Sequence, residues 1–510
     1  MLPASAEVRS GELFAALSLA LDLGTGEPLE HALRTCLIGL ALADRLDLDE
    51  DTRREVYHLS LLHSIGCTAD SPEAAARYGD DIALRFEAAP IDAGRRPEVI
   101  RFIWRASGRN VRRFTAVMAA GPKGAAAGLR AHCEVGERLA EMLSLGPSVQ
   151  DALWFTFERF DGNGFPRGIG GGDIPLPARV VHVARDLHVI ETRSGSAAAA
   201  ESVVAERSGG AYDPQVTAVA PGALAALPEG SVWDAVARAP EGGAPLRGDS
   251  LDRACRAVAY FADLKSTHTL EHSTGVAELA EAAAWRLGLS EDEAAALRRA
   301  GLLHDLGRVG VSSAIWDRAG PLAESEWERV RLHPYYTRRA LARADGLGAI
   351  VDIAASHHER LDGSGYPSGI AAPAQSLSSR VLAAADAFHA MGESRAHRPA
   401  IEPAAAADEM EREARERRLD GEAVVAVLAA AGARRAGGRP KREWPAGLTS
   451  REVEVLRLIA RGRSNRQAAE DLGLSPKTVG HHVQHVYTKI GVSTRAGAAV
   501  FAMQNDLLRE

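Results

Sequence analysis

Apolar residues recur at intervals of three and four along most of the chain. In one stretch they occupy Val276, Leu279, Ala280, Ala283 and Leu287, positions that fall on a single face of an α-helix. The same spacing continues through two long segments. We therefore expect an all-α protein in which amphipathic helices pack as bundles.

Two breaks interrupt this pattern. Residues 226–250 and residues 433–446 are rich in Gly and Pro, which favour turns and loops. A chain of 510 residues is also too long for one ordinary core. We expect domains at 1–225, 251–432 and 447–510, and we expect the first linker to hold one short helix.

The first two segments are copies of one another. His31 and His63 are 32 residues apart, as are His272 and His304, and the next histidine of each copy precedes the Asp of a shared ERxDGxGxPxG motif by 29 residues. Between the second and third histidines the spacing differs, with 69 residues in the first copy and 29 in the second. The repeat is therefore a whole domain, and the first copy carries about forty additional residues.

Composition limits the possible partners and the compartment. The net charge of −8 gives the whole chain no general attraction for nucleic acid or for an anionic membrane. The four cysteines show no CxxC pairing, which suits a reducing compartment. No apolar run approaches the roughly 20 residues that a transmembrane helix needs. We expect a cytoplasmic protein without a membrane partner.

Side chains that bind transition metals are concentrated in the second copy. Imidazole and carboxylate suit iron, manganese or zinc, and two neighbouring ions can clamp the oxygens of an in-line displacement at phosphorus. The set consists of His272, His304, Asp305, His333, His357, His358 and Asp386. A lone histidine on a helix is usually structural, and we interpret His268, His389 and His397 in that way.

The motifs around these residues are similar to those of the HD-GYP family of metal-dependent phosphohydrolases. They are "GLLHDLGRVGV", "LHP", "HHERLDGSGYPSGI" and "RVLAAADAFHAM". The resemblance implies a helical domain with two or three divalent ions, usually iron or manganese, that hydrolyses cyclic di-GMP or a related cyclic dinucleotide. It implies that the seven side chains are metal ligands, that Asp305 and Arg308 act in catalysis, and that Arg308, Gly365, Tyr366 and Pro367 contact the substrate.

Two positions depart from that family. Arg308 replaces the usual Lys, and "RAHR" at 395–398 replaces the usual "RPYR". A planar guanidinium does not substitute directly for an ammonium, so we expect these departures to affect contact with the substrate and to leave metal binding intact.

The first copy has lost most of the metal-binding set. Ser64 replaces the Asp of the HD pair, Thr156 and Phe157 replace His-His, and Arg185 takes the place of the last Asp, with Asp186 one residue out of register. Three neutral histidines cannot hold two divalent ions. Two interpretations stay open: a scaffold or dimerisation surface, or a sensor that still holds a ligand in the old pocket.

The C-terminal unit predicts a helix-turn-helix. We expect one helix from about Ser450 to Arg461, a second from Asn465, and a third that begins at Pro476 behind the N-cap Ser475. Residues 441–510 hold eleven Lys or Arg and seven Asp or Glu, so this end of the acidic chain is locally basic, as contact with phosphates requires.

This unit strongly resembles the LuxR-type DNA-binding module. The resemblance implies that residues 476–490 enter the major groove of double-stranded DNA and that the protein acts as a homodimer. Side chains expected to face bases or phosphates are Lys477, Thr478, Val479, His481 and His482, with Lys489 and Arg495 toward the DNA backbone.

Two functions of different kinds follow. In the first, the chain is a cyclic dinucleotide phosphodiesterase coupled to DNA binding. In the second, it is a transcription factor that uses a non-hydrolytic HD domain as a ligand sensor. The complete ligand set of the second copy favours the first function.

Overall fold

The computed structural model describes residues 7–436 and 444–508 and contains no β-strand within those ranges. The first repeat consists of α1 (Ser10–Thr25), α2 (His31–Arg45), α3 (Glu50–Leu62), α4 (Ser71–Tyr78), α5 (Asp81–Ala88), α6 (Arg96–Ala106), α7 (Val111–Met142), α8 (Pro147–Ala152), α9 (Leu176–Ser194), α10 (Ala197–Glu206) and α11 (Pro214–Ala218). The expected all-α class is confirmed.

The second repeat follows α12 (Val232–Ala237), the one α-helix of the first linker. It consists of α13 (Gly248–Asp263), α14 (His272–Arg286), α15 (Glu291–Leu303), the 3-10 helix η5 (Leu306–Gly310), α16 (Ser313–Trp316), α17 (Glu324–Arg331), α18 (His333–Leu341), α19 (Gly348–Ala354), α20 (Leu377–Met391), α21 (Pro403–Arg415) and α22 (Gly421–Ala436). Helix α22 continues past residue 432, and residues 437–443 of the second expected linker lie outside the described residues.

Equivalent helices of the two repeats begin and end alike. Helices α3 and α15 each have 13 residues, and each ends directly before the second histidine of its copy. Asp49 caps α3 by accepting from the Thr52 amide, and Ser290 and Glu293 form a capping box on α15. These acidic starts satisfy amides that the helix itself leaves unpaired.

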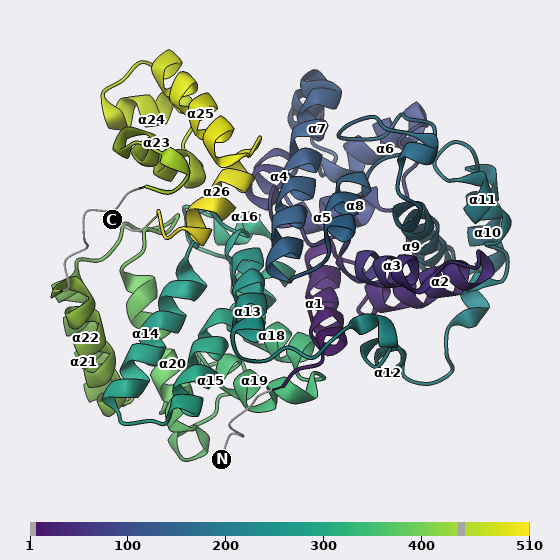
Figure 1. Cartoon of the computed structure of the whole chain (residues 1–510). Coiled ribbons are helices and arrows are strands. Elements are labelled where there is room, and N and C mark those ends of the chain that lie inside the picture. The colour runs from purple at the N-terminus through teal and green to yellow at the C-terminus, as the bar shows by residue number, and fades with distance from the viewer. Residues whose placement is uncertain (1–6, 437–443, 509–510) are drawn as a thin grey trace.

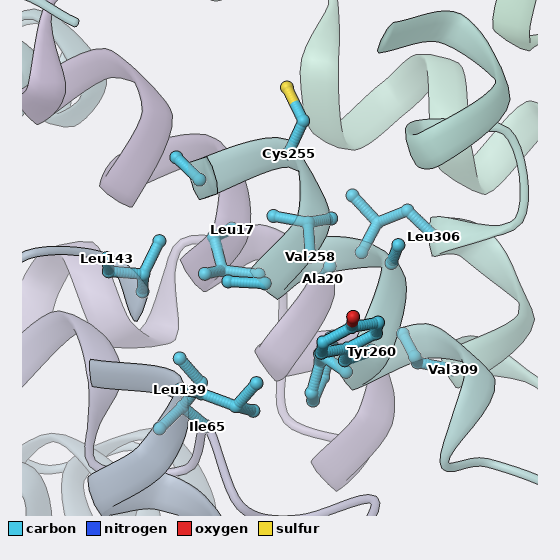
Figure 2. Close-up of a cluster of buried hydrophobic side chains, with 14 of the residues drawn as sticks. Leu17, Ala20, Ile65, Leu139, Leu143, Cys255, Val258, Tyr260, Leu306 and Val309 are labelled. Carbon is cyan, nitrogen blue, oxygen red and sulfur yellow. The ribbon is translucent and has the colours of Figure 1, made fainter. Parts of the chain in front are cut away.

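The leading helix of each repeat packs against the other repeat. Helix α1 contacts η5 and α18 of the second copy, and α13 contacts α7 of the first. Figure 2 shows the resulting cluster, in which Leu17 of α1, Leu139 of α7, Val258 of α13 and Leu306 of η5 meet. The two repeats therefore share one continuous core. Figure 1 shows α1 lying between the two lobes.

The C-terminal module consists of α23 (Ser450–Ala460), α24 (Asn465–Leu472), α25 (Pro476–Ile490) and α26 (Arg495–Gln504). The predicted helix-turn-helix is confirmed, and the Ser475 side chain accepts from the Thr478 amide as an N-cap. In Figure 1 the module lies beside α4 and α7.

Both repeats hold the C-terminal module in place. Helix α26 packs on α7 of the first repeat. Glu134 of α7 accepts from the Ser493 amide at 2.7 Å, and Tyr260 of the second repeat donates to the Met503 carbonyl at 3.0 Å. Within the described ranges, no helix combines the length and apolar character needed to cross a membrane.

Candidate metal centre

Five separate segments of the second repeat bring the predicted ligands together. His272 opens α14, His304 and Asp305 lie between α15 and η5, His333 opens α18, His357 and His358 follow α19, and Asp386 lies in α20. Six of the seven are buried, and the His358 side chain retains 23 % exposure. His358 therefore marks the side on which the centre reaches the surface.

Glycine permits the close packing that this arrangement needs. A Cβ on Gly307 would lie 2.0 Å from the His333 carbonyl oxygen, so only glycine lets η5 approach the start of α18. Gly66 meets His132 of the first copy in the same way, at 1.9 Å. Gly307 thus holds the His304–Asp305 pair beside His333.

Backbone carbonyls fix the orientation of three histidine rings. The Nδ1 atoms of His304, His333 and His357 lie 2.7, 2.6 and 2.6 Å from the carbonyl oxygens three residues earlier in the chain. Each Nδ1 therefore carries a proton and donates it, which leaves Nε2 with a lone pair aimed at the centre.

The two oxygens of Asp305 face different groups of histidines. Oδ1 lies 3.3 Å from His333 Nε2 and 3.7 Å from His357 Nε2, whereas Oδ2 lies 3.6 Å from His272 Nε2 and 3.5 Å from His304 Nε2. One carboxylate thus connects two clusters of nitrogen donors, as a ligand shared by two ions would.

Asp386 makes a second connection. Its Oδ1 lies 3.2 Å from His272 Nε2 and its Oδ2 lies 3.7 Å from His358 Nδ1. The predicted donors group as His272, His304 and Asp386; His304, Asp305 and His357; and His333, His357 and His358, and a fourth group joins His272 to His389 and Glu393.

The electrostatics suit bound cations. Burial opposes ionisation of Asp305 and Asp386, but their histidine neighbours outweigh it, together with Arg308 for Asp305, and the pKa of each carboxyl lies well below its usual range. Burial and the neighbouring His304 and His333 lower the pKa of His357 to about 3. Ionised carboxylates and neutral imidazoles are the forms that bind metals.

Two further observations show that the donors fit a metal. His304 Nε2 is buried and has no hydrogen-bond partner among the described residues. His333 Nε2 and His357 Nε2 lie 3.1 Å apart, although both rings donate through Nδ1 and so present lone pairs to each other. A cation between these nitrogens would resolve both conflicts.

Arg308 is held firmly beside the centre. Its Nη1 lies 3.1 Å from Asp305 Oδ2, and its guanidinium carbon lies 3.9 Å from the centre of the Trp316 ring. The contact with Trp316 uses the planarity of the guanidinium, which a Lys lacks. Trp316 was not singled out from the sequence, since no motif marks it.

The loop with Gly365, Tyr366 and Pro367 borders the exposed side. The Tyr366 ring lies 4.7 Å from the His358 ring, centre to centre. Glu359 fixes the loop by accepting from the Ser368 and Ile370 amides, both at 2.8 Å. A Cβ on Gly365 would lie 2.3 Å from the Arg360 nitrogen, which explains the glycine.

Two more side chains near His272 escaped the sequence analysis. Glu393 Oε2 lies 3.0 Å from His272 Nδ1, and its Oε1 lies 3.3 Å from His389 Nδ1. His389 was interpreted as an ordinary helix residue, but its ring lies 5.5 Å from that of His272. The spacing of Asp386, His389 and Glu393 by three and four residues was the signal that could have found them.

In the first repeat the equivalent positions form no such centre. Within the described ranges, every group of three or more close His, Cys, Asp or Glu donors lies in the second repeat. Arg185 Nε donates to Asp186 at 2.7 Å, and the other Asp186 oxygen accepts from the Tyr212 hydroxyl at 2.6 Å. Asp186 is therefore already engaged.

The predicted DNA-binding side chains of α25 divide into two sets. Lys477, Thr478 and His481 are exposed and His482 is half-buried, whereas Val479 is fully buried in the module. Val479 was expected to face DNA, and this expectation is wrong for a side chain that forms part of the core. Gln484 and His485, also exposed, extend the exposed surface of α25 beyond the residues that were named.

Lys489 and Arg495 are engaged within the module. Lys489 Nζ lies 2.7 Å from Glu452 Oε2, which fixes α25 to α23, and Arg495 donates to Asn465 Oδ1 at 3.0 Å. Both side chains support the helix-turn-helix from within.

A helical domain with a centre of buried histidines and two aspartates, one of which faces two groups of histidines, is typical of metal-dependent phosphohydrolases. The chain belongs to the HD domain family, whose profile matches residues 126–216 and 256–423. A second profile, described as "Bacterial regulatory proteins, luxR family", matches residues 446–502.

Similar proteins include named phosphodiesterases. The chain is 30 % identical over 405 residues to the 3'3'-cGAMP-specific phosphodiesterase 3 of Vibrio cholerae. The aligned region covers 76 % of this chain and 88 % of that protein. It is 35 % identical over 156 residues to a cyclic di-GMP phosphodiesterase response regulator of Xanthomonas campestris, covering 30 % and 40 % of the two chains. A crystal structure of a cyclic GMP-AMP-specific phosphodiesterase from V. cholerae matches with a TM-score of 0.58 and 27 % identity, over 84 % of this chain and 98 % of that chain.

Proposed function

We propose that the second repeat hydrolyses a phosphodiester bond of a cyclic dinucleotide. The observation that carries this proposal is the position of Asp305, whose two oxygens face two separate clusters of histidine nitrogens. The named relatives act on 3'3'-cGAMP and cyclic di-GMP, so these two compounds are the first substrates to test.

The proposed cofactor is a pair of divalent ions, iron or manganese. When bound, the ions supply Lewis acidity and a nucleophile for attack at phosphorus. The proposed ligands are His272, His304, Asp305, His333, His357, His358 and Asp386. His272 Nε2 lies 3.2 Å from Asp386 Oδ1 at the centre, and its Nδ1 lies 3.0 Å from Glu393 Oε2 on the other side of the ring. We favour two ions, with Nε2 as the binding atom of His272 and Glu393 as the residue that positions its ring.

The chain's own residues bind and orient the substrate. Arg308, held by Asp305 and Trp316, presents a cation beside the site for a substrate phosphate. Tyr366 lies over His358 at the exposed side, where its ring can stack on a base. Gly365 and Pro367 shape the loop that carries it.

The C-terminal module is proposed to bind double-stranded DNA through Lys477, Thr478, His481 and His482 on the exposed surface of α25. One recognition helix reads few bases, so we propose that the protein binds as a homodimer on two half-sites. We propose a cytoplasmic location, because the profile of this module describes bacterial regulatory proteins and four buried free cysteines suit a reducing compartment.

One observation favours a second candidate, in which the HD domain senses a ligand without hydrolysing it. Arg308 is engaged by Asp305, so its availability to a phosphate depends on how the ions redistribute the charge of that carboxylate. Incubation of the manganese- or iron-loaded protein with each cyclic dinucleotide separates the two functions: linear product supports the enzyme, and binding without product supports the sensor.

A further inference from the structure

A large cavity lies in the first repeat, away from the metal centre. Its volume is about 950 Å³, at the upper end of the range for sites that bind small organic molecules. His31, His63, His132 and Arg185 line it, so it occupies the position that the metal centre has in the second copy. The cavity is therefore the old active-site pocket, enlarged.

The additional residues of the first copy enclose this cavity. Helices α4 to α6 and the first part of α7 lie between His63 and His132, where the second copy has a shorter connection. They contribute an apolar wall that includes Ala74, Leu84, Ile91, Val99 and Phe102. The segment that distinguishes the two copies is thus the one that makes room for a ligand.

Most buried arginines around the cavity have their donors occupied. Arg85 pairs with Asp70 and Asp81, and Arg159 pairs with Asp92 and Asp161. These pairs cancel their charges and hold the additional helices in place, so they do not provide a site for an anion.

Arg185 differs from these arginines. Only its Nε donates, to Asp186; among the described residues no acceptor is found for its Nη atoms, and the side chain lines the cavity with 23 % exposure. Burial and then the positive charge of Arg185 lower the pKa of His63 to about 3 and that of His182 to about 4. The guanidinium therefore lies among neutral histidines, as the one cation at the former metal position.

We propose that this cavity binds a small organic anion whose acidic head pairs with the Nη atoms of Arg185 and whose apolar body packs on the wall of α4 to α6. A carboxylate or a phosphate presents two oxygens that can accept from the two Nη donors of a guanidinium. Arg85 and Arg159, which also line the cavity, face carboxylates, so Arg185 is the guanidinium that we assign to the acidic head.

The ligand would also touch the DNA-binding module. Tyr487 of α25 and Arg495 of α26 line the same cavity as Arg185. The site is thus formed by two domains, and the occupied cavity would have a wall that belongs to the DNA-binding module.

The proposal is tested by calorimetric titration of the full chain, kept metal-free with a chelator so that the metal centre binds no phosphate. The probes share one apolar body: 2-naphthoate, 1-naphthyl phosphate and uncharged 2-naphthol. We expect one molecule of at least one anion to bind per chain, and 2-naphthol to bind at least about tenfold more weakly. The two anions distinguish a carboxylate head from a phosphate head.

Three variants locate the binding. Arg185→Gln keeps a donor for Asp186 and should weaken the anion about 10- to 100-fold. Ala89→Trp adds a large ring to the cavity wall and leaves Arg185 unchanged, so it should weaken binding at least about tenfold, whereas Arg54→Gln removes an exposed charge elsewhere and should change affinity less than about threefold. Absence of binding by both anions, equal binding of 2-naphthol, or unchanged affinity in Arg185→Gln and Ala89→Trp would overturn the proposal.

Discussion

The Asp81 carboxylate of the first repeat lies 2.6 Å from the Lys265 ammonium of the second. Both side chains are buried, with 0 % and 1 % exposure. Asp81 also accepts from the Ser312 hydroxyl and the Ser313 amide, both at 2.9 Å. Asp81 thus joins the additional helices of the first copy to the segment after α13, through Lys265, and to the loop after η5, through Ser312.

Removal of the charge of Asp81 should destabilise the protein strongly. Asp81→Asn leaves Lys265 buried and without its counter-ion, which costs about 3–5 kcal/mol. Urea denaturation measures the loss. The matched control is Asp51→Asn, whose partner Arg54 is exposed and whose loss should cost about 0–1 kcal/mol. Equal losses in the free energy of unfolding would show that the buried pair stabilises the protein no more than the exposed pair.

The same pair predicts the response to acid. Burial favours the protonated form of Asp81, but Lys265 and Arg85 outweigh it, and its pKa lies well below the usual value. A depressed pKa stabilises the fold above the unfolded value of about 4, and this contribution falls as the pH drops below it. The Asp81→Asn variant lacks this titrating group. Its stability should therefore change less than that of the wild type between about pH 5 and pH 3, as measured by circular dichroism.

Metal content should depend on the second repeat alone. The double variant His304→Ala, Asp305→Ala removes one donor and the shared carboxylate, so bound iron or manganese should fall to background in elemental analysis. His63→Ala, at the equivalent position of the first copy, should leave metal content nearly unchanged. Equal loss from both proteins would mean that the first copy also binds metal.

Glu393 should act through His272 and not as a ligand. Glu393→Gln weakens the acceptor for His272 Nδ1 and should lower metal affinity about 10- to 100-fold, measured by competition with a chelator. Glu409→Gln, on the exposed helix α21, is the control and should have no effect. Complete loss of one ion in Glu393→Gln, with the remaining metal bound as tightly as in the wild type, would instead make Glu393 a metal ligand.

DNA binding should depend on Lys477 and on salt. Lys477→Ala should weaken binding by about 1–3 kcal/mol if the side chain contacts a base, and by less if it meets only a phosphate. Arg451→Ala removes the same charge from α23, outside the exposed surface of α25, and controls for net charge. DNA affinity should be measured at several salt concentrations and should fall as salt increases. An affinity independent of salt would contradict contact with phosphates.

The sequence predicted which seven donors the structure brings together, because the spacing of histidines recurs in two copies and only one copy keeps the aspartates. Glu393 and Trp316 could not be found in that way, since each acts through a tertiary contact, with His272 and Arg308 respectively. Val479 was misplaced because one helical turn carries both surface and core positions, and the core position depends on how α25 packs. A ligand pocket in the first repeat was one of the two interpretations left open from the sequence. Its apolar wall escaped prediction, because that wall comes from helices whose sequence carries no motif.

Hydrolysis by the second repeat is the proposed property most directly open to measurement. Protein loaded with manganese or iron should convert cyclic di-GMP or 3'3'-cGAMP into a linear dinucleotide, resolved by liquid chromatography, and the His304→Ala, Asp305→Ala variant should form none. His63→Ala should retain the rate of the wild type to within about twofold, a change below ~0.5 kcal/mol in the barrier. Absence of linear product from fully metal-loaded wild-type protein, or equal product from the His304→Ala, Asp305→Ala variant, would contradict the account.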